Sequence, residues 1–187
     1  MCHQLCKTLS WWRPSHPEVR TLLNIDRLDV EILRRLSADA RTGVVELASS
    51  LGVSRNTVQS RVRRLEEAGL VTGYRPQFDI AQAGFPVQAF VALEITQVRL
   101  SAVVEELAEI PQVLEVHATT GREDLLVRVA TVTQAELQEL IERVVAIPGV
   151  VHSVTTLCLT TPLPFRVIPL LDESTRDTGW GRSTPRP

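Results

Sequence analysis

The chain has 187 residues, of which 44% are hydrophobic and 4% aromatic, so it can bury aliphatic cores in one large or two small domains. Its net charge of −2 is unevenly spread: residues 26–75 carry nine basic and seven acidic side chains, whereas residues 76–187 carry eight basic and fourteen acidic. No apolar run reaches the roughly 18 residues that span a bilayer, no signal peptide is recognisable, and three scattered cysteines make a disulfide framework improbable. We expect a cytoplasmic protein whose front part alone meets an anionic partner.

Composition and periodicity divide the chain into five segments. The first contains Trp11 and Trp12, which either pack on the body or a partner or belong to a dispensable extension. The last is rich in Pro, Gly, Ser, Thr and Arg, a composition typical of disorder. The expected boundaries are 1–24 for a poorly ordered extension, 25–75 for a helical domain, 76–86 for a linker, 87–161 for alternating strands and helices, and 162–187 for a tail that is largely disordered after 171.

Three helices are predicted within residues 25–75. The apolar periodicity of residues 28–36 indicates the first, with Asp26 as its N-cap. Residues 44–51 indicate the second, which ends at Gly52, where positive φ is usual.

The third helix covers about residues 55–68 and begins after the N-cap Ser54. Residues 70–75 follow Gly69 and have a β-like pattern, which predicts the strand of a wing. The inner face of this helix repeats at i, i+4 and i+7 and consists of Val58, Val62 and Leu65.

The second and third helices meet the joint requirements of a helix-turn-helix. Ala48 is small where two helices must cross, Gly52 tolerates positive φ in the turn, and Val53 and Val58 supply the apolar contacts. A solvated charged face on an ordinary helical domain is the alternative. The joint fit favours a domain that places its third helix in the major groove of DNA.

The third helix carries four arginines and no acid between Ser54 and Leu65. Side chains that project away from the inner face can pair with base edges, whereas Arg61 and Arg64 are expected to reach phosphate. The predicted DNA-binding residues are Ser54, Arg55, Asn56, Thr57, Gln59, Ser60, Arg61, Arg63 and Arg64.

The second half contains an internal repeat with an offset of 37 residues. A helix, the motif Ile110-Pro111-Gln112-Val113 and a strand recur as a helix, Ile147-Pro148-Gly149-Val150 and a strand. Each copy follows a strand of alternating pattern, and Thr133 with Glu136 predicts a capping box on the second helix. Two such units in series predict a ferredoxin-like βαββαβ fold. The whole chain is therefore expected to be α+β, with an N-terminal winged helix-turn-helix domain and this C-terminal domain.

One face of the predicted sheet would pack on the helices and leave the other face open. Apolar side chains fall on that face in one register or the other. An open apolar face favours a partner, most simply a second copy of the chain. The candidates are Phe90, Leu114, Val116, Leu126 and Val154.

Both halves of the chain resemble the Lrp/AsnC (feast/famine) family of transcription regulators over about residues 25–161. The matching motifs are Ile25-Asp26-Arg27-Leu28-Asp29, Asp39-Ala40-Arg41, Glu46-Leu47-Ala48, Gly52-Val53-Ser54, Arg61-Val62-Arg63-Arg64-Leu65-Glu66, Gly73-Tyr74, Thr120-Gly121-Arg122-Glu123-Asp124 and Ile147-Pro148-Gly149-Val150. The resemblance implies a regulator of double-stranded DNA with a RAM-type (ACT-like) effector domain. It also implies dimers that assemble into octamers, and no cofactor.

The segment between the second and third predicted strands is a candidate effector site. From the residues alone it is either a plain hairpin loop or a set of exposed N–H groups suited to an anion. The resemblance implies that its amides hold the carboxylate of an amino acid between subunits, while Asp124 binds the ammonium group or braces the loop. The expected effector residues are Thr120, Gly121, Arg122, Glu123, Asp124 and Thr155. Residues 151–154 depart from the family pattern, so leucine is not assumed.

The alternatives are a metal site, an enzyme and a one-domain assembly module that has lost DNA binding, and the intact arginine-rich third helix argues against the last. His117, His152 and Cys158 on strands, or Cys2, His3 and Cys6 near the start, could hold a metal, but neither set has convincing spacing. Sirohaem decarboxylases resemble the same family and are the enzymatic alternative. The chain has four histidines and no convincing catalytic pattern, so we expect no enzyme and no metal.

Overall fold

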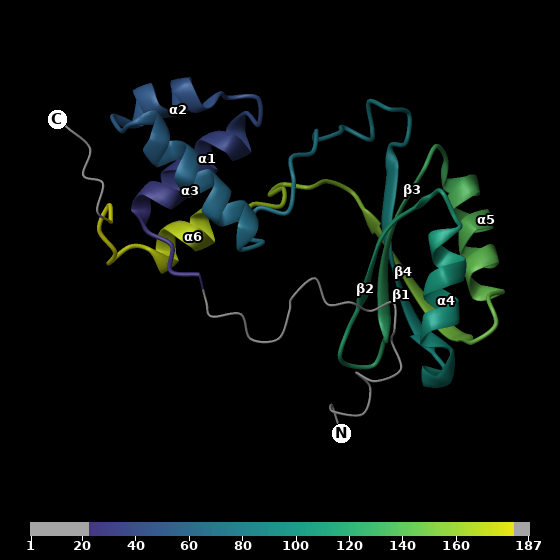
Figure 1. Ribbon diagram of the computed structural model, residues 1–187. Coiled ribbons are helices and arrows are strands. Elements are labelled where there is room, and N and C mark those ends of the chain that lie inside the picture. The colour runs from purple at the N-terminus through teal and green to yellow at the C-terminus, as the bar shows by residue number, and fades with distance from the viewer. Residues whose placement is uncertain (1–22, 182–187) are drawn as a thin grey trace. The chain divides into compact units, whose positions relative to one another are not determined.

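The computed structural model describes residues 23–181, which form two compact units (Figure 1). Of the described residues, 23–76 and 164–181 form the helical unit, and residues 77–163 form the sheet unit. Residues 1–22, with Trp11 and Trp12, lie outside the described part. None of the described helices is long and apolar enough to cross a membrane.

Helices α1 (Arg27–Ala38), α2 (Val44–Leu51) and α3 (Arg55–Glu67) begin and end close to the predicted positions. Asp26 caps α1 and forms a reciprocal capping box with Asp29. Gly52 ends α2 in the left-handed conformation, with φ 66°. The N-cap and C-cap positions therefore define a helix-turn-helix, as the sequence predicts.

The core of the helical unit consists of two small apolar clusters. One contains Leu28, Ile32 and Leu51, and the other contains Leu47, Ala48 and Val58. Half-buried apolar side chains from α1, from the turn between α2 and α3, and from α3 pack against both clusters, namely Leu36, Val53 and Val62. Because these clusters bury little apolar surface, we expect polar contacts to contribute to the arrangement of the three helices.

The predicted disorder after residue 171 is wrong for residues 172–181. Residues Ile168–Ser174 form a helix, α6, in the helical unit, and Thr175 is 2% exposed. Trp180 packs against the cluster of Leu28, Ile32 and Leu51. Contacts with α1 therefore order a segment whose composition alone indicates disorder.

The wing strand predicted at residues 70–75 is absent from the described structure. The N–H groups of Leu70 and Val71 both donate to the carbonyl of Leu65, at 3.0 and 3.2 Å. These bonds complete the C-terminus of α3 and leave the segment without a partner strand. The helix-turn-helix is therefore described without its wing.

The sheet unit has the predicted βαββαβ order. Its strands are β1 (Val87–Ile95), β2 (Val113–Ala118), β3 (Leu125–Thr131) and β4 (Val150–Cys158). A short 3₁₀ turn, η2 (Gln97–Arg99), leads into α4 (Leu100–Ala108), and α5 (Gln134–Val145) joins β3 to β4. Thr133 caps α5 by accepting from the N–H of Glu136 at 3.1 Å, while Glu136 accepts from Val132 rather than from Thr133.

The four strands form an antiparallel sheet in the order β2-β3-β1-β4, with α4 and α5 on one face (Figure 1). In β1 the side chains of Ala89, Val91, Leu93 and Ile95 are buried, so alternate residues face the helices. Fourteen buried apolar residues from the sheet, the helices and the two Ile-Pro motifs form one core cluster. This core holds the loop between β2 and β3 on a rigid support.

The register also identifies the side chains on the open face of the sheet. Phe90 lies opposite Arg128 and Thr156, and Ala92 lies opposite Leu126 and Val154. Val116 belongs to the other face, because it pairs with the core residue Val127 and packs against the core. Leu114 is 45% exposed at a break in the register.

Candidate nucleic-acid interface and effector loop

Helix α3 is anchored in the helical unit by its apolar face. Val58 and Leu65 are completely buried, and Val62 packs between the two clusters. At its start, the Ser54 hydroxyl accepts from the N–H of Thr57 at 3.1 Å and lies 2.9 Å from the Thr57 hydroxyl. Ser54 and Thr57, both predicted DNA-binding residues, are therefore engaged in the helix cap.

The opposite side of α3 is open to solvent. The side chains of Arg55, Asn56, Gln59, Ser60 and Arg63 are exposed. Ser60 donates to the carbonyl of Thr57 at 3.0 Å, and Arg63 pairs with Glu67 at 2.7 Å. The Arg63–Glu67 pair is more than 60% exposed on both sides, so it is weak and easily exchanged for another anion. The structure thus gathers five of the predicted residues on one free surface.

Arg61 and Arg64 have a different environment from the one predicted. The Arg61 guanidinium lies 2.5 Å from Asp26 and 3.0 Å from Asp29. Arg64 pairs with the other oxygen of Asp29 and donates to the carbonyl of Asn24 at 3.3 Å. The Arg61 side chain is 15% exposed, and the Asp29 side chain is completely buried. These arginines hold α3 to α1, and their expected contact with phosphate stays a prediction.

The charge balance at this contact favours the ionised groups. Burial raises the pKa of the Asp26 carboxyl, but hydrogen bonds from Arg61, from the N–H groups of Asp29 and Leu28, and the Arg61 charge together bring it below its usual value. For Arg61, burial lowers the pKa, and its bonds to Asp26 and Asp29 raise it by more. The contact between α1 and α3 is therefore an ion pair at neutral pH.

Asp26 and Asp29 are the functional residues whose ion pairs sequence reasoning missed. Asp29 follows Leu28 and precedes Ile32 and Leu33 by three and four positions, so it lies beside the apolar stripe of α1. A carboxylate at such a position requires a buried cationic partner. This signal was available in the sequence.

The candidate effector loop joins β2 to β3. The Thr119 N–H donates to the Asp124 carbonyl at 2.9 Å, and the Thr119 hydroxyl donates to the Glu123 carbonyl at 2.7 Å. Within the described residues, the N–H groups of Thr120, Gly121, Arg122 and Glu123 have no hydrogen-bond partner. Gly121 has φ 131°, and no atom beyond its two chain neighbours lies within 4 Å of the point a Cβ would occupy. The loop therefore offers four consecutive N–H groups without a partner beside an open glycine, a composition that suits an anion.

Asp124 braces this loop. Its carboxylate accepts from the N–H of Ile95 at 2.8 Å, and its own N–H donates to the Leu93 carbonyl at 2.8 Å. Both bonds tie the end of the loop to the end of β1, where the pairing of β1 with β4 shifts register. These bonds are those of a brace, and a contact between Asp124 and a ligand ammonium group stays a prediction.

Thr155 is separated from the loop within one chain. It lies on β4 opposite Val91 of β1, and Val91 lies opposite Val127 of β3. Strand β1 therefore stands between Thr155 and β3, from which the loop departs. Within one chain the structure does not join Thr155 to the five loop residues.

The alternative metal site has no counterpart among residues 23–181, where no three potential ligands are grouped. His117 pairs with Glu115 at 3.1 Å on β2, at one edge of the sheet, whereas His152 and Cys158 lie on β4 at the other. The set of Cys2, His3 and Cys6 lies outside the described residues.

Known proteins match both units in the same order. Residues 25–66 match the AsnC-type helix-turn-helix domain, and residues 88–168 match the Lrp/AsnC ligand binding domain. The regulatory protein AsnC of Haemophilus influenzae is 32% identical over 135 residues, which cover 72% of this chain and 90% of that protein. The structure of AsnC from E. coli is 30% identical, with a TM-score of 0.72, and the match covers 78% of this chain and 99% of AsnC.

The transcriptional regulator NMB0573 of Neisseria meningitidis, solved as an L-Met complex, has the same fold, with a TM-score of 0.71. It is 22% identical, and the match covers 79% of this chain and 99% of that structure. The similar proteins are named regulators, and none of these matches supports the decarboxylase alternative. The chain belongs to the Lrp/AsnC family of transcriptional regulators, and it is not an enzyme.

Proposed function

We propose that this regulator reads specific operator sequences with the exposed side of α3. Arg55, Asn56, Gln59 and Arg63 carry the groups that can form paired hydrogen bonds with base edges in the major groove. Ser60 and the helix start, at Ser54 and Thr57, would contact phosphate or sugar. A dimer would present two such helices to half-sites one helical turn apart. Because transcription takes place where the chromosome lies, we propose a cytoplasmic location.

The observation that carries this proposal is the division of the arginines on α3. Arg61 and Arg64 are held by Asp26 and Asp29, so the helix is fixed to its own unit on one side. Among residues 23–181, the exposed Arg63–Glu67 pair is the one ion pair on the opposite side. A helix with a braced back and a free polar front is suited to docking in a groove.

Replacing Arg63 with Ala tests this role. We expect operator affinity to fall by about 1–3 kcal/mol, because a side chain paired with a base is lost, while the oligomeric state stays the same. Arg143→Ala is the matched control, since Arg143 is an exposed arginine on α5 in the sheet unit. Equal affinities of the wild type and Arg63→Ala in a gel-shift titration would remove Arg63 from the interface.

The proposed regulatory input is a small molecule, an amino acid, bound at the loop between β2 and β3. The free N–H groups of Thr120, Gly121, Arg122 and Glu123 would bind its carboxylate. The Asp124 brace would keep these donors in place, and Thr155 would approach from a neighbouring subunit. The L-Met complex of NMB0573 supports an amino acid as the class of ligand. To regulate, the ligand must bind one state of the assembly better than another.

The loop is tested by a screen of the twenty amino acids by thermal shift, followed by operator titrations with each hit. Gly121→Asp adds a carboxylate among the free donors, so we expect it to abolish the response and to spare basal DNA binding. Gly84→Asp is the matched control, because Gly84 also has positive φ and open surroundings but lies before β1. A Gly121→Asp protein that still responds would move the effector site elsewhere.

We propose a homodimer formed through the open face of the sheet, with dimers assembling into an octamer. Phe90, Ala92, Leu126 and Val154 supply its apolar surface. Val154→Glu should dissociate the dimer in sedimentation velocity. Val145→Glu on α5 is the control, because these valines are 45% and 43% exposed respectively. Dissociation in both variants, or in neither, would exclude this face as the interface.

A further inference from the structure

The C-terminal segment from Pro164 to Gly181 belongs to the helical unit, although it follows the last strand of the sheet unit. The match to the Lrp/AsnC ligand binding domain ends at residue 168. Most of α6 and the chain from there to Gly181 therefore extend past that domain. The structure assigns this extension to the helical unit.

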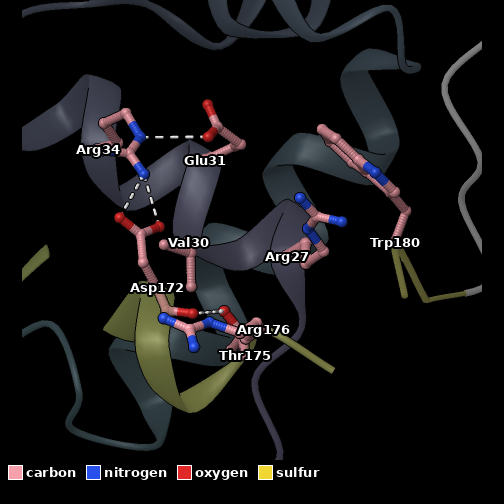
Figure 2. A pocket seen from close by; sticks show the side chains of 8 residues that line it. All are labelled: Arg27, Val30, Glu31, Arg34, Asp172, Thr175, Arg176 and Trp180. Carbon is pink, nitrogen blue, oxygen red and sulfur yellow. Dashed lines mark hydrogen bonds and ion pairs between the residues drawn. The ribbon is translucent and has the colours of Figure 1, made fainter. Parts of the chain in front are cut away.

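Val30 is an apolar residue on the side of α1 that faces away from α2 and α3, so burying it requires a further segment. Leu28 and Ile32 lie two residues before and after Val30, so Val30 projects from the opposite side of α1. It is nevertheless only 2% exposed, and neither cluster of the helix-turn-helix core contains it. Helix α6 packs on α1, and the groove between them is lined by Val30 and Thr175 (Figure 2). The extension thus buries a side chain that the three-helix core leaves out.

Polar contacts hold the extension at both ends of this cover. The Nη2 group of Arg34 in α1 donates to both carboxylate oxygens of Asp172 in α6, at 2.5 and 2.7 Å, and Nε of Arg34 donates to Glu31 (Figure 2). Further along, the N–H of Arg27 donates to the carbonyl of Gly179 at 3.3 Å. A hydrogen bond between two charged groups is stronger than one between neutral groups. These contacts fix the register of the extension along α1.

Trp180 reaches the core from the same side. It is half-buried against the cluster of Leu28, Ile32 and Leu51, which joins α1 to α2. At the next residue, Gly181, a Cβ would collide with the carboxylate of Asp26 and come within 2.8 Å of the Arg61 guanidinium. At Gly181 the extension therefore lies beside the ion pairs that hold α3.

We propose that residues 164–181 form an intramolecular clasp that completes the DNA-binding unit and positions α3 through α1. The clasp holds α1 by Val30, Arg34 and Trp180, and α1 holds the recognition helix by Asp26 and Asp29. A consequence is that both ends of the sheet unit are joined covalently to parts of the helical unit. The clasp is a positioning element and does not itself contact bases.

Trp180 supplies a direct probe of the clasp. The chain has three tryptophans, so in a Trp11→Phe/Trp12→Phe variant Trp180 is the sole indole. We expect its emission to be blue-shifted and protected from acrylamide in the native full chain. The emission should stay the same on dilution through dissociation of the oligomer. An emission typical of free tryptophan would overturn the proposal, and exposure on dilution would show that a second copy supplies the clasp.

The ion pair between Arg34 and Asp172 allows a reciprocal test in that variant background. Arg34→Asp and Asp172→Arg each place like charges together, so we expect Trp180 to become more exposed and operator affinity to fall several-fold. The double exchange should restore both. Glu173→Ala is the matched control, because Glu173 is the next acidic residue on α6 and pairs with Arg176 instead of α1. Failure of the double exchange to restore affinity would contradict the coupling of the clasp to α3.

A chain ending at Arg166 measures the whole contribution. We expect the helical unit to melt at least about 5 °C lower and to bind operator more weakly, while the sheet unit keeps its transition and its ligand response. A truncated chain with wild-type operator affinity would overturn the positioning role. Loss of the ligand response in the wild type would instead refute the proposed effector, so the two failures are distinguishable.

Discussion

The sheet unit buries fourteen apolar side chains in one cluster, whereas the helical unit divides its core into two clusters with three buried apolar residues each. The helical unit also contains a completely buried carboxylate, Asp29, between two arginines. The described residues of the sheet unit contain no completely buried carboxylate. The difference shows that a small helical domain can orient its elements by charge where apolar surface is scarce.

This difference has a functional consequence. Buried ion pairs contribute little net stability, but they fix geometry, since any other arrangement leaves a charge unpaired. In the helical unit the fixed element is α3, whose other side is proposed to read DNA. In the sheet unit the continuous core supports a loop of free N–H groups. Each unit thus holds a polar surface on a rigid support. The support is a set of ion pairs in the helical unit and an apolar core in the sheet unit.

The largest expected effect comes from Asp29→Ala. Both arginines would lose a partner while half-buried, so we expect a loss of about 3–5 kcal/mol in the stability of the helical unit. Hydrogen exchange of peptides from both units would measure it, and the sheet unit should be unaffected. Glu31→Ala is the control, because the Glu31 side chain is 32% exposed and binds only Arg34. A loss no larger than that of the control would mean that apolar contacts alone hold α3.

Leu107→Ala tests the other side of the comparison. Leu107 of α4 is completely buried in the sheet-unit core, so its truncation should cost about 2–5 kcal/mol in that unit alone. Leu114 lies on the neighbouring strand β2 and is 45% exposed, so Leu114→Ala should reduce the stability of the sheet unit much less. Thermal unfolding followed by hydrogen exchange would separate the units. A matching loss of protection in the helical unit would show that the two units do not unfold independently.

The helix caps predict a smaller pair of effects. Thr133→Ala and Ser54→Ala each remove an accepting hydroxyl from a helix start, so each should cost about 1 kcal/mol in its own unit. Only Ser54→Ala should also weaken operator binding, because α3 alone is proposed to meet DNA. Equal operator affinities for the two variants would show that the start of α3 lies outside the interface.

Much of this fold was predictable from local patterns. The helices of the helix-turn-helix follow from apolar periodicity and from the caps at Asp26 and Ser54, and the βαββαβ order follows from the repeated Ile-Pro motifs. The contacts that escaped prediction join distant segments: Arg61 meets Asp29 across 32 positions, and Arg34 meets Asp172 across 138. Local propensity carries no information on such pairs.

Two errors have the same origin. Residues 70–75 have a strand-like pattern, but their N–H groups at Leu70 and Val71 are used by the end of α3. Helix α6 has seven residues, with Pro169 in its first turn, and it is too short to be stable without α1. In both cases tertiary contacts decided the outcome. The exposed side of α3 was predictable because helical periodicity alone determines which side chains oppose the buried face.

The smallest effect at neutral pH is expected from Asp26→Asn, since asparagine still caps α1 and Asp29 still binds Arg61. The pKa of Asp26 is lower in the folded protein than its ordinary value of 3.8, because bonds from Arg61 and the N–H groups outweigh burial. Its charge therefore stabilises the helical unit above that value, and this contribution is lost as the pH falls through the lowered pKa. Denaturant titrations of both proteins should give a stability difference that is constant at neutral pH and shrinks below about pH 4. If the stability difference between the two proteins persists at low pH, hydrogen bonding alone accounts for it. The charge of Asp26 would then make no contribution to the helical unit.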